Sequence, residues 1–84
     1  MMHYHVDLFE VRDGKFYFVM DSEPLMKRAA LREFRRKVLE LSKQVGKFVV
    51  KRNASDFAGA IRVALNHRIA IALSRCDCDG GEGR

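Results

Sequence analysis

The fold is decided largely by HYHVDLFEVRDGKFYFVMD, residues 3–21, in which two runs rich in β-branched and aromatic residues flank Asp13-Gly14. A two-residue Asp-Gly turn needs positive φ angles, which Gly tolerates and Asp accepts. The segment therefore predicts a β-hairpin in which Arg12 faces Lys15. One face of this hairpin would carry Phe9, Val11, Phe16, Phe18 and Met20, and the other Tyr4, Val6, Leu8, Tyr17 and Val19.

A long helix is expected after the hairpin. Pro24 suits the first turn of a helix, and Asp21 or Ser22 could accept backbone N–H bonds just before it. Apolar residues then recur at helical spacing as far as Val45, and Gly46 is a typical residue to end a helix. The buried stripe predicted from this spacing is Leu31, Phe34, Val38, Leu41 and Val45.

The second half of the chain predicts a strand, a short helix and a strand. KFVVKR (47–52) and RIAIALSR (68–75) are the strands, and the segment between them reads as a short helix, which is capped at Asn53-Ala54-Ser55-Asp56 and ends near Asn66-His67. The order ββαβαβ predicts an α+β two-layer sandwich, with a four-stranded mixed sheet, two helices on one face and right-handed β-α-β crossovers. Residues 1–75 would form one domain and residues 76–84 a flexible, acidic, Gly-rich tail.

Composition and charge narrow the class of protein. The 84 residues are 48% hydrophobic and 32% charged, which is typical of one soluble domain and excludes disordered and collagen-like chains. We expect a cytoplasmic protein with no membrane partner, because no apolar run could span a bilayer and no signal peptide is visible. The net charge of +5 is uneven: residues 25–52 contain ten Lys and Arg but two Asp and Glu, a charge of +8.

The basic residues of this segment predict a nucleic-acid-binding surface. Arginine side chains present planar groups of N–H donors that suit phosphates. On the long helix the basic residues lie opposite the apolar stripe, so the same pattern also fits a solvated helix face, or a surface for an acidic protein or a membrane. The candidate phosphate-binding residues are Arg28, Arg32, Arg35, Arg36 and Lys43, with Lys51 and Arg52 at the end of the following strand.

Catalytic and metal-binding patterns are weak, so we expect no catalytic residue and no cofactor. Asp7, Glu10 and Asp21 could bind a metal ion as in a nuclease only if they met on the hairpin. A zinc site would need the first and last strands to be neighbours, and its candidate ligands are His3, His5, Cys76 and Cys78. The simpler interpretation is exposed histidines and two free thiols, in keeping with a reducing compartment.

From Phe18 to Arg68 the chain resembles the Alba family of small archaeal chromatin and RNA-binding proteins. The matching features are a strand, Pro24-Leu25-Met26 opening a helix, Gly46, KFVVKR and SDFAGAIRVALNHR. The resemblance implies a dimeric two-layer α/β protein that binds DNA or RNA with little sequence preference, with Lys51 and Arg52 contacting the nucleic acid. The chain departs from the family in carrying Ser22-Glu23 before the proline and in lacking a closing hairpin.

These observations predict a small basic protein that binds DNA or RNA with weak sequence specificity. A homodimer is expected, since a core of this size is small and the hairpin aromatics would be covered by a second copy or by the core. The alternative is a structural or regulatory protein–protein interaction module without nucleic acid.

Overall fold

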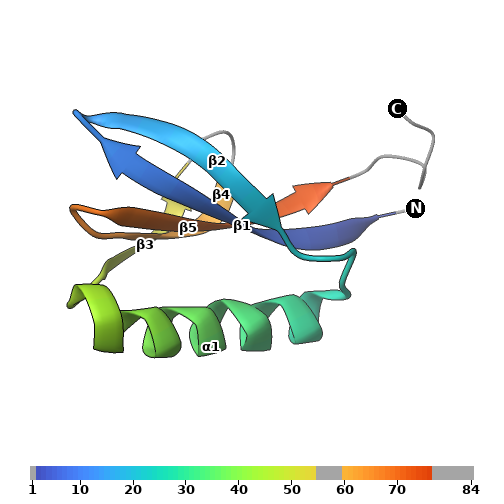
Figure 1. Ribbon diagram of the computed structural model, residues 1–84. Coiled ribbons are helices and arrows are strands. Elements are labelled where there is room, and N and C mark those ends of the chain that lie inside the picture. Colours follow the sequence, from blue (N-terminus) through green and yellow to red (C-terminus); the bar gives the residue numbers. More distant parts are fainter. Residues whose placement is uncertain (1, 55–59, 77–84) are drawn as a thin grey trace.

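The computed structural model describes residues 2–54 and 60–76. They form β1 (His3–Arg12), β2 (Lys15–Asp21), α1 (Lys27–Val45), β3 (Val49–Ala54), β4 (Ala60–Leu65) and β5 (Ile69–Cys76). The five strands make one antiparallel sheet in the order β2-β1-β5-β4-β3. The helix crosses one face of this twisted sheet (Figure 1).

The hairpin of β1 and β2 is confirmed, but one of its faces is not. Arg12 lies opposite Lys15, and the turn between them has positive φ angles of 51° at Asp13 and 74° at Gly14. A register shift between Leu8 and Phe9 then places Leu8 opposite Met20 and Phe9 opposite Phe18. The prediction that Met20 shares a face with Phe9 is therefore wrong, because a β-bulge reverses the alternation of one strand relative to the other.

The helix ends as predicted but begins differently. Gly46 ends α1 with a φ of 97°. The predicted cap is wrong: Asp21 belongs to β2, and the Ser22 hydroxyl accepts a hydrogen bond from the Val6 backbone N–H at 3.0 Å. Leu25 and Tyr4 exchange two backbone hydrogen bonds of 2.8 and 2.9 Å, which hold the connection extended beside β1 and delay the helix to Lys27.

The ββαβαβ sandwich with two helices is also wrong. The part of the predicted second helix that the structure describes is strand β4, while residues 55–59 lie outside the described ranges. Val63 and Ala64, neighbours in sequence that face opposite sides of the sheet, are both fully buried. A short apolar run fits either helical or strand spacing, and its position between β3 and β5 decides for a strand.

The sheet consequently differs from the predicted one in three ways. Among the described residues it has five strands and not four, it is entirely antiparallel and not mixed, and one helix covers it where two were expected. The expected β-α-β crossovers do not form, because β2 and β3, which α1 connects, occupy the two opposite edges of the sheet.

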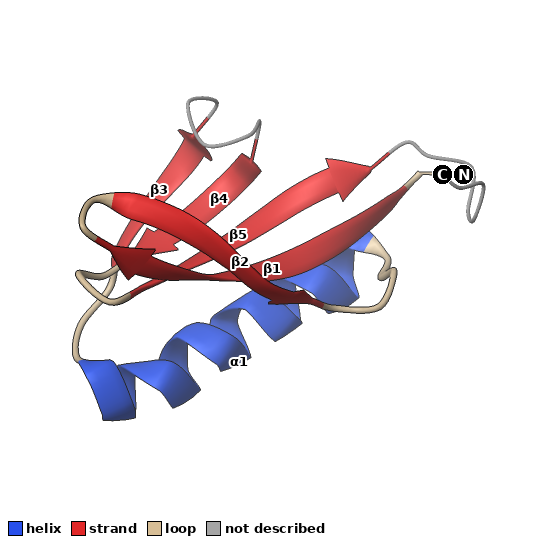
Figure 2. Cartoon of the chain, turned by 45° about the horizontal axis from the view of Figure 1, so that its top comes forward, coloured by secondary structure: helices blue, strands red, loops and turns tan. Residues whose placement is uncertain are grey.

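The main core lies between α1 and the sheet. Ala30 and Phe34 of the helix pack on Val6, Ile71 and Leu73. A smaller cluster on the other face joins Ala60, Val63 and Ala72, with Phe9 and Leu65 against it. The helix packs mainly against β1 and β5, so the hairpin of β3 and β4 extends beyond it (Figure 2). Among the described residues no helix is long and apolar enough to cross a membrane.

Candidate nucleic-acid interface

A groove runs between α1 and the β3–β4 hairpin on the helix side of the sheet. It consists of two adjoining hollows of about 360 and 260 Å³, which share Leu31 and Arg62 in their walls. Arg35 lines the larger hollow, and Lys27 and Arg52 line the smaller one. We call this the basic groove, and it is defined by Lys27, Arg35, Arg52 and Arg62.

Two arginines of the basic groove face each other across neighbouring strands. Arg52 of β3 is the direct register partner of Arg62 of β4. Directly opposed like charges destabilise a sheet, since their side chains emerge about 5 Å apart. Within residues 2–54 and 60–76, neither side chain forms an ion pair. The fold therefore holds two positive charges together without a described carboxylate to offset them.

The helix contributes the other two cations. Lys27 and Arg35 are eight residues apart on the flank of α1 that faces β3 and β4, which separates them by about 12 Å along the helix axis. Both side chains are exposed, and neither has an ion-pair partner in the described part of the chain. The groove is thus basic along its length and on both sides.

Apolar side chains lie between these cations. Leu31 is half-buried, whereas Leu39 and Val50 are 63% and 50% exposed and line the larger hollow. Exposed apolar surface beside positive charge suits a ligand with alternating anionic and apolar parts. A nucleic-acid strand, with its phosphates, sugars and bases, has this alternation.

The predicted basic residues of the helix lie in three different surroundings. Arg35 lies in the basic groove, while Arg28, Arg32 and Lys43 are exposed on α1 without a described ion pair. Arg36 is different, because its guanidinium binds Glu33 at 2.7 Å and Glu40 at 3.1 Å.

The interaction with Arg36 also changes the pKa of Glu33. A hydrogen bond from Arg36 lowers the pKa of Glu33 below its ordinary value, against a smaller opposing effect of burial. The positive charge of Arg36 is accordingly offset on the helix itself.

Lys51 and Arg52, predicted together, point to opposite faces of the sheet. Consecutive strand residues alternate between faces. Arg52 lines the basic groove, whereas Lys51 lines a separate hollow of about 480 Å³ with Lys47 and Asn66.

Sequence reasoning missed Lys27 and Arg62. Arg62 was placed within a short helix, and only its register opposite Arg52 shows its importance. The available signal was the strand alternation of residues 62–65, which directs Arg62 and Ala64 to the face that α1 covers and Val63 and Leu65 to the other.

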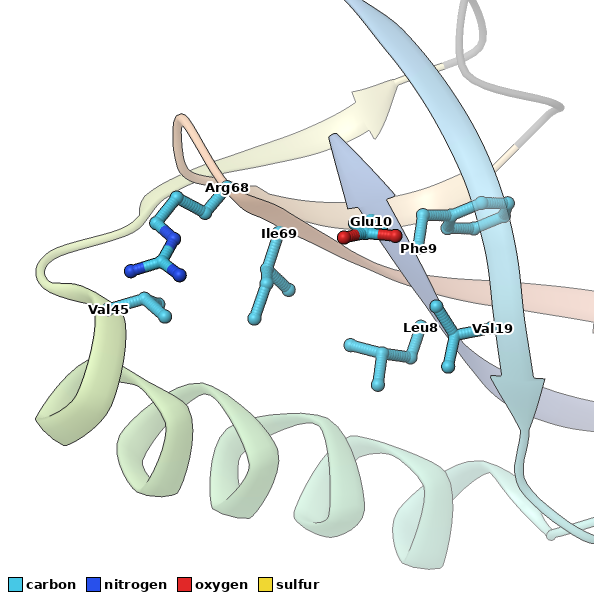
Figure 3. A pocket seen from close by; sticks show the side chains of 7 residues that line it. All are labelled: Leu8, Phe9, Glu10, Val19, Val45, Arg68 and Ile69. Atoms are coloured by element: carbon cyan, nitrogen blue, oxygen red, sulfur yellow. The ribbon is translucent and has the colours of Figure 1, made fainter. Parts of the chain in front are cut away.

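Another hollow of about 340 Å³ lies between β1 and the C-terminal end of α1 (Figure 3). Its walls include Leu8, Val19, Val45 and Ile69, with one acidic residue, Glu10, and one basic residue, Arg68. This mixed charge makes it a poorer site for a polyanion than the basic groove.

The acidic residues considered for a nuclease are only partly brought together. Asp7 lies directly opposite Asp21, but Glu10 belongs to the other face of β1 and forms an ion pair with Arg12 at 3.5 Å. In the described part of the chain these three carboxylates form no common metal-binding group.

The candidate zinc ligands are brought together. β1 and β5 are neighbours, His3 is the register partner of Cys76, and His5 shares the face of His3. The expectation of exposed histidines and free thiols is wrong for the described residues: His3 is 9% exposed, His5 is half-buried, and Cys76 is disulfide-bonded. Cys78 lies outside the described residues.

Comparison with known proteins found no matching family model, no matching curated protein and no matching solved structure. The resemblance to the Alba family stays a prediction.

Proposed function

We propose that this chain binds DNA or RNA through the basic groove and the exposed basic face of α1 beside it. The observation that carries the proposal is the opposed pair Arg52 and Arg62, to which Lys27 and Arg35 add charge from the helix. A phosphate lying between these side chains would attract each of them and so offset the repulsion between their positive charges.

The exposed helix residues extend this surface. Arg28, Arg32 and Lys43 lie further around α1 from the core, and Leu39 lies among them with 63% of its surface exposed. Arg36 contributes less, because Glu33 and Glu40 already bind its guanidinium. The strongest interaction is therefore expected where the helix and β3–β4 contribute charge together.

Binding through this surface would depend little on sequence. Phosphate contacts position a protein on nucleic acid, whereas base-edge contacts specify the sequence. The groove offers cations and apolar side chains, and its one aromatic residue, Phe34, is only 3% exposed and cannot serve as a stacking platform. We propose that the protein acts in the cytoplasm, where nucleic acid is accessible.

The test is a fluorescence anisotropy titration of labelled duplex DNA, single-stranded DNA and RNA at 50 and 200 mM NaCl. Each phosphate contact gives a slope of about −0.9 in log K against log salt for a duplex and −0.7 for a single strand. The four groove cations therefore predict at least about 50- to 150-fold weaker binding over this salt range, and contacts from the exposed helix residues would increase this loss. Absence of binding at 50 mM would exclude the proposal and favour a protein–protein module.

A matched pair of variants assigns the binding to the groove. Arg52→Gln with Arg62→Gln removes two opposed charges, and we expect the loss of affinity between 50 and 200 mM salt to become smaller by a factor of about 7 to 12. Arg12→Gln with Lys15→Gln removes two equally opposed charges from the tip of the other hairpin, where Arg12 is already paired with Glu10. Equal weakening by both double variants would show that net charge, and not the groove, determines affinity.

The homodimer also stays a proposal, and β2 is the surface that supports it. Every residue of this edge strand is exposed, including Phe18 at 60% and Met20 at 49%. An apolar edge strand readily pairs with another strand. Edge-to-edge pairing of β2 with the same strand of a second copy would cover these side chains.

A further inference from the structure

We propose that the reduced chain holds a divalent transition-metal ion, Zn²⁺ by preference, on His3, His5 and Cys76. The site lies where the start of β1 meets the end of β5 (Figure 1). It does not depend on the basic groove or on nucleic-acid binding.

The geometry of the three side chains fits a metal ion. One ligand atom from each of His3, His5 and Cys76 lies within 4.8 Å of the others, and the two histidine Nε2 atoms are 2.9 Å apart. Tetrahedral zinc with Zn–N bonds near 2.05 Å places two nitrogen ligands about 3.3 Å apart. A small separation of the two rings therefore admits the ion.

The hydrogen bonds of His5 direct the correct atom toward the cluster. Its Nδ1 lies 3.0 Å from the carbonyl oxygen of Ser22, which can only accept, so Nδ1 carries the proton and donates. The lone pair of His5 is then on Nε2, which accepts from His3 Nε2. An outer hydrogen bond of this kind fixes the tautomer of metal-binding histidines in general.

The surroundings favour a cation. Asp21 Oδ2 lies 4.0 Å from His5 Nδ1, and Asp7 faces Asp21 across the strands. A positive ion between the strands would be attracted by these nearby carboxylates and bound by the buried imidazole of His3 and the half-buried imidazole of His5.

Metal binding requires reduction, because Cys76 is disulfide-bonded in the structure. A dithiol reductant transfers two electrons and two protons to the two cysteine sulfurs, the S–S bond breaks, and the dithiol closes to its own disulfide. Cys76 then releases its thiol proton to solvent as Sγ binds Zn²⁺, and the His3 proton moves from Nε2 to Nδ1. A water molecule completes the four ligands of the ion.

Cobalt provides the first test, because thiolate-to-Co²⁺ charge transfer absorbs light whereas a sulfur in a disulfide gives no such band. The full chain is titrated with Co²⁺ with and without a phosphine reductant. We expect one Co²⁺ per chain, a charge-transfer band in the reduced protein alone, and loss of the band when Zn²⁺ is added. The same band in the unreduced protein, or none in the reduced protein, would overturn the proposal.

Variants then identify the ligands by competition for Zn²⁺ with a chromophoric chelator. Changing an outer hydrogen-bond partner costs 10- to 100-fold in affinity, so His5→Gln or Cys76→Ser should cost at least about 100-fold. His67→Gln is the matched control, because His67 is exposed and lies outside the cluster. An equal loss in the control would mean that Zn²⁺ binds elsewhere.

Circular dichroism shows whether each variant folds. If a variant does not fold, a second measurement on the wild-type protein tests the site. Nuclear magnetic resonance of the wild-type imidazole nitrogens should show that Zn²⁺ shifts His3 and His5 but not His67. Shifts confined to His67, or absent from His3 and His5, would count against the site.

Discussion

Removing either arginine of the opposed pair should stabilise the fold at low salt. Arg52 and Arg62 are direct register partners, and we take their guanidinium groups to be about 7 Å apart, where Coulomb's law in water gives about 0.6 kcal/mol of repulsion. Measured effects of cross-strand pairs fall in the same range. Each single variant, Arg52→Gln or Arg62→Gln, should therefore gain about 0.5 kcal/mol, or about 2 to 4 °C in Tm.

The double variant is the informative one. If repulsion within the pair is the cause, either substitution removes all of it, so the double variant should gain about 0.5 kcal/mol and not the sum of two gains. In 1 M NaCl the screening length falls to about 3 Å, and the gains should disappear. Urea unfolding followed by circular dichroism measures all four proteins without adding ions.

The tip of the other hairpin supplies the control. Arg12 also faces a like charge, Lys15, but its Nε lies 3.5 Å from Glu10, and its guanidinium lies 4.2 Å from the centre of the Tyr17 ring. Arg12→Gln should therefore lose stability or leave it unchanged. The reasoning is refuted if Arg52→Gln and Arg62→Gln destabilise the protein at low salt, or if their gains persist unchanged in 1 M NaCl.

Two further predictions concern the helix and the edge strand. The hydrogen bond from Arg36 lowers the pKa of Glu33, so this carboxylate stabilises the fold above its ordinary value of 4.5, and the effect is lost as pH falls through the lowered pKa. Glu33→Gln should lower Tm by about 1 to 4 °C at pH 7 but not at pH 2, with Glu23→Gln as the control in thermal unfolding. Phe18→Lys should make a β2-paired dimer monomeric in light scattering, and an unchanged mass would exclude pairing through this strand.

The sequence predicted those elements whose signals are local. The turn at Asp13-Gly14 needs only positive φ angles, and the helix end at Gly46 needs only a residue that tolerates them. The bulge after Leu8 could not be predicted, because the register between β1 and β2 is a property of the strand pairing and no local residue pattern specifies it. Local residue types therefore predict where a turn or a helix end forms, whereas the register of a strand depends on its pairing with distant parts of the chain.

The second helix was predicted wrongly for the same physical reason. Ala60, Ile61, Ala64 and Leu65 have helical spacing, but the run is short enough to be a strand as well. Its neighbours β3 and β5 decide between them, since a strand between two others satisfies its backbone hydrogen bonds on both sides. Arg62 consequently moved from the surface of an expected helix to the position opposite Arg52.

The two candidate sites differ in what the sequence could reveal. The basic composition of residues 25–52 was visible, but the pairing of Arg52 with Arg62 required a strand order that composition does not contain. The candidate metal ligands His3, His5 and Cys76 were visible in the sequence, and their meeting required only that β1 and β5 be neighbours.

The stability of the fold connects the groove to its proposed ligand. An 84-residue domain has a small core, so repulsion of about 0.5 kcal/mol is a noticeable fraction of its stability. A ligand at 100 times its Kd stabilises the folded state by about 2.7 kcal/mol, several times the cost of the opposed arginines. If the proposed function holds, Arg52 and Arg62 would weaken the free protein and strengthen the complex, which is the balance expected of residues that serve binding and not folding.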